Sequence, residues 1–183
     1  ASNSALTSIR EALKAAPSNS FSMKNLNGIR FTGERTLRYT ADEIDAMFDT
    51  YEIGVYTFML LSLLYPNLKY SQKGFHQDHM HPYTGFEEGK IKDLVLPDGT
   101  VIDDDTKEDW RRRRNTLANL QLLEGRENES KNATPLGDWL KVTENSENAK
   151  YLPSGVSYEL SNFEEFMEKR QELMSKALKD ILL

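Results

Sequence analysis

The spacing of apolar residues predicts several helices in the first third of this chain. Residues 4–16 have the spacing of a helix, and a proline follows directly. Thr40 and Glu43 have the pattern of a capping box ahead of a short helix, and residues 31–39 are compatible with a short extended segment. Residues 55–64 are almost entirely apolar, which predicts a helix that is buried on most sides.

The C-terminal part of the chain predicts one long helix. Ser161 and Glu164 have the spacing of a second capping box. The apolar residues that follow recur at helical spacing, so we expect one face of this helix to belong to the core. The members of this stripe are Phe163, Phe166, Met167, Met174, Ala177, Leu178 and Ile181.

The middle of the chain has a mixed pattern. Residues 75–80 predict a strand or extended loop, and residues 117–123 alternate weakly, as in a strand. A glycine then turns the chain into a helical segment at residues 126–131. Residues 94–102 predict a small hairpin around a Pro-Asp-Gly turn, and residues 106–114 a polar helix. Residues 135–140 are typical of a loop with a packed tryptophan.

Composition places the chain among soluble globular proteins. It has 183 residues, of which 38% are hydrophobic and 28% charged, and this suits one compact domain. Because there is no cysteine, disulfides and thiolate metal sites are excluded, and a reducing cytoplasm is the expected location. The longest apolar run, near residues 56–65, is about half of a membrane span, so we expect no membrane contact.

The charge of the chain is unfavourable for a nucleic-acid partner. The net charge is −6, whereas proteins that bind nucleic acid are usually basic. The charge is uneven, because a block of four arginines at 111–114 follows an acidic run at 103–105. Such a block is more often a solvated helix face than a phosphate clamp, and Trp110 and Trp139 are more often packing residues than base-stacking platforms.

All three histidines fall within six residues of one another. His76, His79 and His81 lie in the segment FHQDHMHP at 75–82. In an ideal strand, adjacent residues project to opposite faces, so Asp78 and His79 share a site only if the strand ends there or the site wraps around it. His76 and His81 are as compatible with a structural role as with a catalytic one.

Polar residues of the second strand and its following helix supply candidate partners for this segment. Asn119 precedes Asn128 by nine residues, enough for a short strand and a turn. Asn128 and Lys131 are one helical turn apart and share a face. The spacing therefore permits these three side chains to meet Asp78 and His79.

The chemistry of these residue types fits phosphodiester hydrolysis. A neutral His79 is able to take a proton from water near pH 7. Oxygen atoms of Asp78 and Asn128 are suitable ligands for a divalent cofactor, Mg²⁺ or Mn²⁺. Lys131 would place a positive charge on the phosphate, and Asn119 would orient the His79 ring or brace the loop between the strands.

These segments resemble a known nuclease family. Residues 78–82, 119–123 and 128–131 (DHMHP, NLQLL and NESK) resemble the HNH, or ββα-metal, nucleases. Within them the chain is most similar to the C-terminal domain of a two-domain bacterial restriction family. The match is specific over about residues 39–140. It implies an Asp-His-Asn-Asn site without zinc, DNA as partner, modified bases in some members, and an N-terminal ParB-like domain.

Together these patterns predict an α+β fold with a small ββα-metal core surrounded by helices. We expect a helical lead-in over residues 1–69, the nuclease core over 70–145 and a C-terminal helix over 146–183. The chain would be a fragment of a longer protein and an endonuclease of restriction or anti-phage defence. Two alternatives are open: a nucleic-acid-binding or regulatory module that does not cleave, and, more weakly, a structural metal site.

Overall fold

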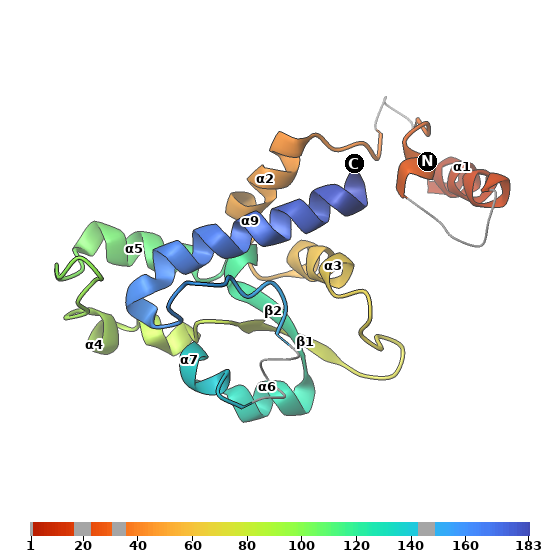
Figure 1. Cartoon of the computed structure of the whole chain (residues 1–183). Coiled ribbons are helices and arrows are strands. Elements are labelled where there is room, and N and C mark those ends of the chain that lie inside the picture. The colour runs from red at the N-terminus through yellow and green to blue at the C-terminus, as the bar shows by residue number, and fades with distance from the viewer. Residues whose placement is uncertain (1, 17–22, 31–35, 143–148) are drawn as a thin grey trace.

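A computed structural model describes residues 2–16, 23–30, 36–142 and 149–183 (Figure 1). The fold is mixed α+β: helices pack around a two-stranded antiparallel sheet. The α-helices are α1 (Ser2–Ala15), α2 (Ala41–Thr50), α3 (Val55–Leu64), α4 (Glu88–Ile91), α5 (Asp104–Arg113), α6 (Gly125–Lys131), α7 (Leu136–Trp139) and α9 (Phe163–Leu182). The strands are β1 (Phe75–His79) and β2 (Leu120–Glu124), and the 3-10 helices are η1 (Met23–Leu26), η2 (Tyr83–Phe86), η3 (Leu117–Asn119) and η4 (Leu160–Asn162).

The two strands are far apart in sequence. β1 pairs with β2 antiparallel, with Asp78 opposite Gln121 and His79 opposite Leu120. The long segment between them folds on itself as η2, α4, an isolated bridge between Val95 and Val101, and α5. β2 continues directly into α6, so the expected order of two strands followed by a helix is present. The turn expected at residues 94–102 is present as well.

Helix α9 is the central element of the core. Five residues of the expected stripe are buried, and α9 contacts α2, α3 and η3. In Figure 1, α9 and α3 lie on one side of the sheet and α6 on the other. The buried face of α9 also carries Arg170, whose guanidinium donates to the carbonyls of Ala118, at 2.6 Å, and Leu120, at 3.0 Å. Arg170 thus attaches α9 to the segment that leads into β2.

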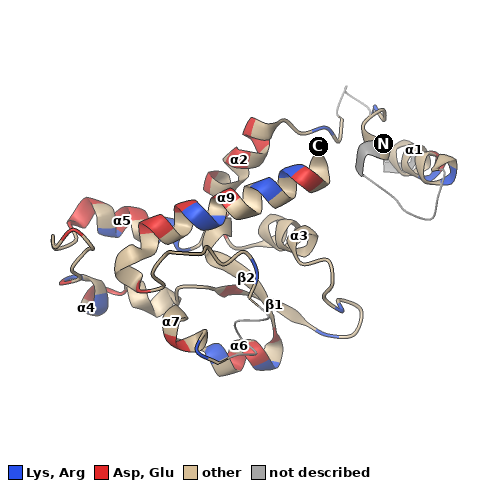
Figure 2. Cartoon of the chain, in the orientation of Figure 1, with Lys and Arg blue, Asp and Glu red and all other residues tan. Residues whose placement is uncertain are grey.

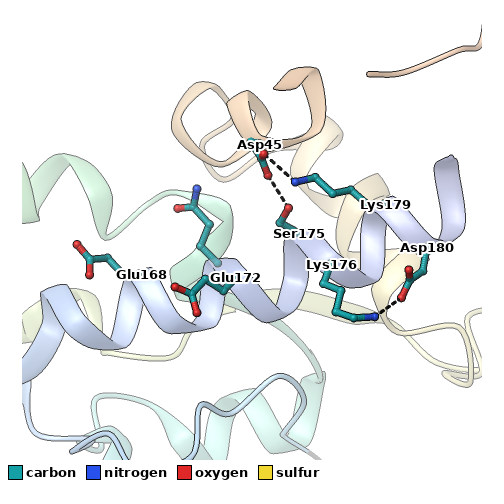
Figure 3. Close-up of a pocket in the computed structure, with 8 residues that line it drawn as sticks. Asp45, Glu168, Glu172, Ser175, Lys176, Lys179 and Asp180 are labelled. Carbon is teal, nitrogen blue, oxygen red and sulfur yellow. Dashed lines mark hydrogen bonds and ion pairs between the residues drawn. The ribbon is translucent and has the colours of Figure 1, made fainter. Parts of the chain in front are cut away.

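Polar contacts attach α2 to α9 near the C-terminus (Figure 3). Asp45 accepts a hydrogen bond from the Ser175 hydroxyl at 2.5 Å and one from Lys179 at 2.7 Å. These hydrogen bonds, that from Lys179 above all, lower the pKa of the Asp45 carboxyl. A shallow hollow beside them is lined largely by charged residues of α9, including the ion-paired Lys176 and Asp180.

Local sequence accounts for the starts of several helices. The capping box at α2 is confirmed: Glu43 N–H donates to the Thr40 hydroxyl at 3.2 Å, and Thr40 N–H donates back to the Glu43 carboxylate at 2.7 Å. Asp103 caps α5 by accepting from the Thr106 N–H at 2.7 Å. α6 ends at Asn132, with a φ of 42°, in the left-handed region that asparagine tolerates.

The structure corrects two expectations about α3 and the start of α9. Helix α3 is not buried on most sides, because only one of its faces packs against α9 and β2, and Val55 is 75% exposed. The capping box expected from Ser161 and Glu164 is wrong. Residues 160–162 form η4, which runs directly into α9, and the N-cap Asn162 makes no side-chain capping bond.

Two smaller expectations also change. The loop expected at residues 135–140 contains the short helix α7, and its tryptophan is packed as expected. Of the extended segment expected at 31–39, residues 31–35 lie outside the described residues, and 36–39 form no strand. Among the helices of the described ranges, none is both long enough and apolar enough to span a membrane.

Candidate active site

His79 occupies the last position of β1, and its ring is held by a side chain from the end of α5. Its Nε2 lies 3.0 Å from the Asn115 side-chain oxygen, and its ring centroid lies 5.8 Å from that of Tyr83. Because the asparagine oxygen only accepts, Nε2 carries the proton and Nδ1 of the neutral ring keeps its lone pair. Burial lowers the pKa of His79, although the hydrogen bond that the ring donates to Asn115 and the charge of Asp78 oppose the shift.

Asp78 points to the other side of the strand, toward α6. Its carboxylate is nearly buried, and Oδ2 accepts from Gln121 Nε2 at 2.9 Å and lies 3.0 Å from Lys131 Nζ. The contact with Gln121 follows from the register, because the two residues are directly opposite in the antiparallel pair. No hydrogen bond joins Oδ1 to any described residue, so one carboxylate oxygen is left for another ligand.

Lys131 is fully buried and does not project toward a substrate. Besides its ion pair with Asp78, its ammonium donates to the backbone carbonyl of His79 and lies 5.7 Å from the centroid of the Trp139 ring. Burial lowers the pKa of Lys131, while Asp78 opposes that shift. In this position Lys131 attaches α6 to the end of β1, whereas the sequence predicted a contact with phosphate.

Asn119 braces the chain just beyond β1. Its side chain is completely buried and accepts from the His81 N–H at 2.9 Å. It also donates to the carbonyls of His81, at 3.1 Å, and Arg114, at 2.8 Å. Of the two roles expected for Asn119, the structure shows the bracing one, while the ring of His79 is oriented by Asn115.

Asn128 lies on α6, one turn before Lys131. Its side chain is half-buried and makes no hydrogen bond with the described part of the chain, so its amide oxygen is free to bind a ligand. The described residues contain no group of three or more His, Cys, Asp or Glu side chains placed to hold a metal ion. A metal at this site would therefore depend on Asp78, Asn128, water and substrate.

The other two histidines have different environments. His81 is buried, and its ring makes edge contacts with Phe163, at 5.5 Å, and Phe166, at 4.7 Å, between centroids. Burial lowers the pKa of His81 to about 3. His76 is exposed on the strand. His81 is therefore a neutral core residue, and His76 is not part of the enclosed site.

Sequence reasoning did not assign roles to Asn115 or Gln121, which hold His79 and Asp78. Asn115 was visible as a polar residue after the arginine block, but its contact with His79 depends on where α5 ends in space. Gln121 was detectable only once the register of β1 and β2 was known.

No protein-family model matches this chain, and no curated protein matches it at a significant level. Support for a function therefore comes from the residues of the site and their geometry.

Proposed function

We propose that this chain is a metal-dependent endonuclease that hydrolyses phosphodiester bonds in DNA. One observation carries the proposal: His79 Nε2 lies 3.0 Å from the Asn115 side-chain oxygen, and because that oxygen only accepts, we infer that the ring proton is on Nε2 and that Nδ1 is left as a proton acceptor. The preceding residue, Asp78, projects to the other side of β1 and is a nearly buried carboxylate with one oxygen free of protein hydrogen bonds. Attack of water on a phosphate ester needs a base and a metal ligand, and a site that wraps around the end of β1 would include both, because His79 is the last residue of the strand.

In this proposal His79 is the general base. Nδ1 takes a proton from water, the water oxygen forms a bond to phosphorus, and the bond from phosphorus to the deoxyribose oxygen breaks, with that oxygen taking a proton from solvent. The lowered pKa of His79 keeps the ring neutral near pH 7, so the base is available. Asn115 acts as a positioning residue, because it fixes the ring plane and the tautomer.

Asp78 and Asn128 are the residues that would hold a divalent cation. A carboxylate and an amide oxygen are hard ligands, which fit Mg²⁺ or Mn²⁺ and leave positions for water and phosphate. When bound, the ion would neutralise charge on the phosphate and on the leaving oxygen. Lys131 contacts only Oδ2 of Asp78, so its ion pair leaves Oδ1 for the metal.

The order strand, strand, helix, with Asp78 and His79 at the end of β1 and Asn128 on α6, supports the resemblance to ββα-metal nucleases. From this resemblance we propose a role in restriction or anti-phage defence in the cytoplasm. DNA, modified in some cases, would be the substrate, and a ParB-like domain the partner. Each of these statements stays a prediction.

One observation favours the alternative, a nucleic-acid-binding module that does not cleave. The Lys131 ammonium already neutralises Asp78, as expected of a site that works without a metal. Binding of Mn²⁺ to the wild-type chain and to an Asp78→Asn variant separates the two functions. A nuclease should bind Mn²⁺ through Asp78, and the alternative should show no difference between the two chains.

The direct test is incubation of the purified chain with plasmid DNA and Mg²⁺, Mn²⁺ or EDTA. We expect cleavage with either metal and none in EDTA. His79→Ala should lose about a hundredfold or more in rate, as expected for a general base. His76→Ala is the matched control, because it removes an exposed histidine from the same strand, and it should cleave normally. Full activity of a clean His79→Ala preparation would refute the assignment.

A further inference from the structure

Three of the four arginines at the end of α5 are engaged within the protein. Arg111 donates to the carbonyl of Phe86 and pairs with Glu88 at 2.5 Å. Arg112 pairs with Asp109 at 2.7 Å. The third, Arg113, pairs with Asp109 and, at 3.0 Å, with Glu164 of α9. The sequence predicted a solvated helix face, and in the structure these three side chains are held in ion pairs, with Arg113 only 17% exposed.

Arg114 differs from its neighbours. Within the described ranges it has no ion-pair partner, and its Nε is buried without a hydrogen-bond acceptor. The guanidinium lies 3.5 Å from the centroid of the Tyr83 ring. Stacking on an aromatic ring stabilises the cation but does not satisfy its N–H groups. A buried donor without an acceptor is unfavourable, so the guanidinium of Arg114 has unused capacity to bind an anion.

Arg114 also lies beside the candidate base. The Tyr83 ring on which it stacks contacts the His79 ring, and the next residue, Asn115, holds His79 Nε2. Since Lys131 is buried against Asp78, it does not supply the cation that the substrate phosphate requires.

We propose that Arg114 binds the phosphate of the DNA substrate at this site, donating two parallel hydrogen bonds to its non-bridging oxygens. The planar fork of arginine matches a phosphate in this way, and Tyr83 holds the plane of the guanidinium. This inference rests on the proposed function and assigns its phosphate-binding residue.

The rest of the charge distribution increases the weight of this one contact. Lys and Arg residues share α4, α5, α6 and α9 with Asp and Glu residues (Figure 2), and the net charge is −6. Since most non-specific affinity for DNA comes from cations on phosphates, an acidic chain should depend strongly on a cation that lies beside the candidate base.

The test measures binding separately from cleavage. A short fluorescent DNA duplex is titrated in EDTA with the wild-type chain, Arg114→Ala and Arg112→Ala, over a series of salt concentrations. Arg112→Ala is the matched control, because it removes the same charge from an ion pair on the same helix. We expect Arg114→Ala to bind about tenfold more weakly and to reduce the salt slope by about one, and Arg112→Ala to differ little from wild type.

Arg114→Lys separates geometry from charge. It should retain most of the salt slope but lose about threefold or more in affinity, because an ammonium cannot make the paired contact. If Arg114→Ala unfolds by circular dichroism, this variant decides the question. The proposal would be overturned if wild type and Arg114→Ala bound the duplex with equal affinity, or if Arg112→Ala lost as much affinity as Arg114→Ala. It would also be overturned if the wild-type chain did not bind. Arg114-dependent binding by a chain that never cleaves DNA would refute only the proposed function.

Discussion

The two asparagines near the site should separate stability from activity. Asn119 is completely buried and makes three side-chain hydrogen bonds, while Asn115 is half-buried and makes one, to His79. Replacement of each by alanine removes a side chain of the same size and chemistry from positions four residues apart. The two variants are therefore matched controls for each other.

The loss of stability in Asn119→Ala follows from its hydrogen bonds. Each contributes a net of about 1 kcal/mol, and their loss leaves the N–H and carbonyl of His81 and the carbonyl of Arg114 without this partner. We expect the free energy of unfolding to fall by about 3 kcal/mol. With a denaturant dependence of about 2 kcal/mol per molar urea, the midpoint should shift by about 1.5 M.

Asn115→Ala should have the opposite profile. One hydrogen bond to a half-buried ring contributes about 1 kcal/mol or less, so the urea midpoint should move by about 0.5 M or less. Without this contact, the His79 ring is free to rotate and to exchange tautomers. A displacement of about 1 Å costs up to about a hundredfold in rate, so we expect cleavage to fall by about tenfold to a hundredfold.

Both variants are measured by urea unfolding, followed by circular dichroism, and by plasmid cleavage under conditions in which each remains folded. Equal destabilisation by the two substitutions would refute this reasoning, since burial and hydrogen bonding would then not determine the loss in free energy of unfolding. A fully active Asn115→Ala would show that the contact with Asn115 does not position His79.

Three further predictions concern buried charge and titration. Burial lowers the pKa of His81 to about 3, whereas its pKa in the unfolded chain is about 6.5. The fold is therefore fully stable above pH 6.5 and loses stability as the pH falls toward 3, because only the unfolded chain takes up the proton. At pH 4.5, urea unfolding should detect a loss of about 2–3 kcal/mol in the free energy of unfolding that is absent in His81→Leu. Arg170→Leu should lose about 3 kcal/mol or more in the same assay, because two carbonyls ahead of β2 lose a charged donor. Lys131→Met should lose about 3–5 kcal/mol by leaving Asp78 buried and unpaired, and Asp78→Asn in the same chain should restore part of that loss; no recovery would contradict the pairing.

The sequence by itself determined the elements whose signals are local. The capping box at Thr40, the apolar stripe of α9 and the run of strand, turn and helix ending at Lys131 all depend on neighbours within a few residues. The same local spacing placed Asp78 and His79 at the end of one strand and Asn128 on the following helix. For these features no knowledge of distant segments was needed.

Only the tertiary structure decided which polar side chains meet. Asn115 contacts His79 because α5 ends beside β1, 36 residues away along the chain. Lys131 is buried because α6 packs on β1, and this packing brings its ammonium to Asp78. The spacing of the two residues in the sequence does not predict that contact.

Burial itself was also decided in three dimensions. The almost entirely apolar sequence of α3 carries no signal for its exposed face, because only the neighbours it meets determine which residues are covered. Conversely, arginine is rarely buried, yet Arg170 is fully buried because its guanidinium donates to the backbone carbonyls of Ala118 and Leu120. Periodicity gives the preferred conformation of a segment, whereas burial and polar contacts depend on the partners that the fold brings to it.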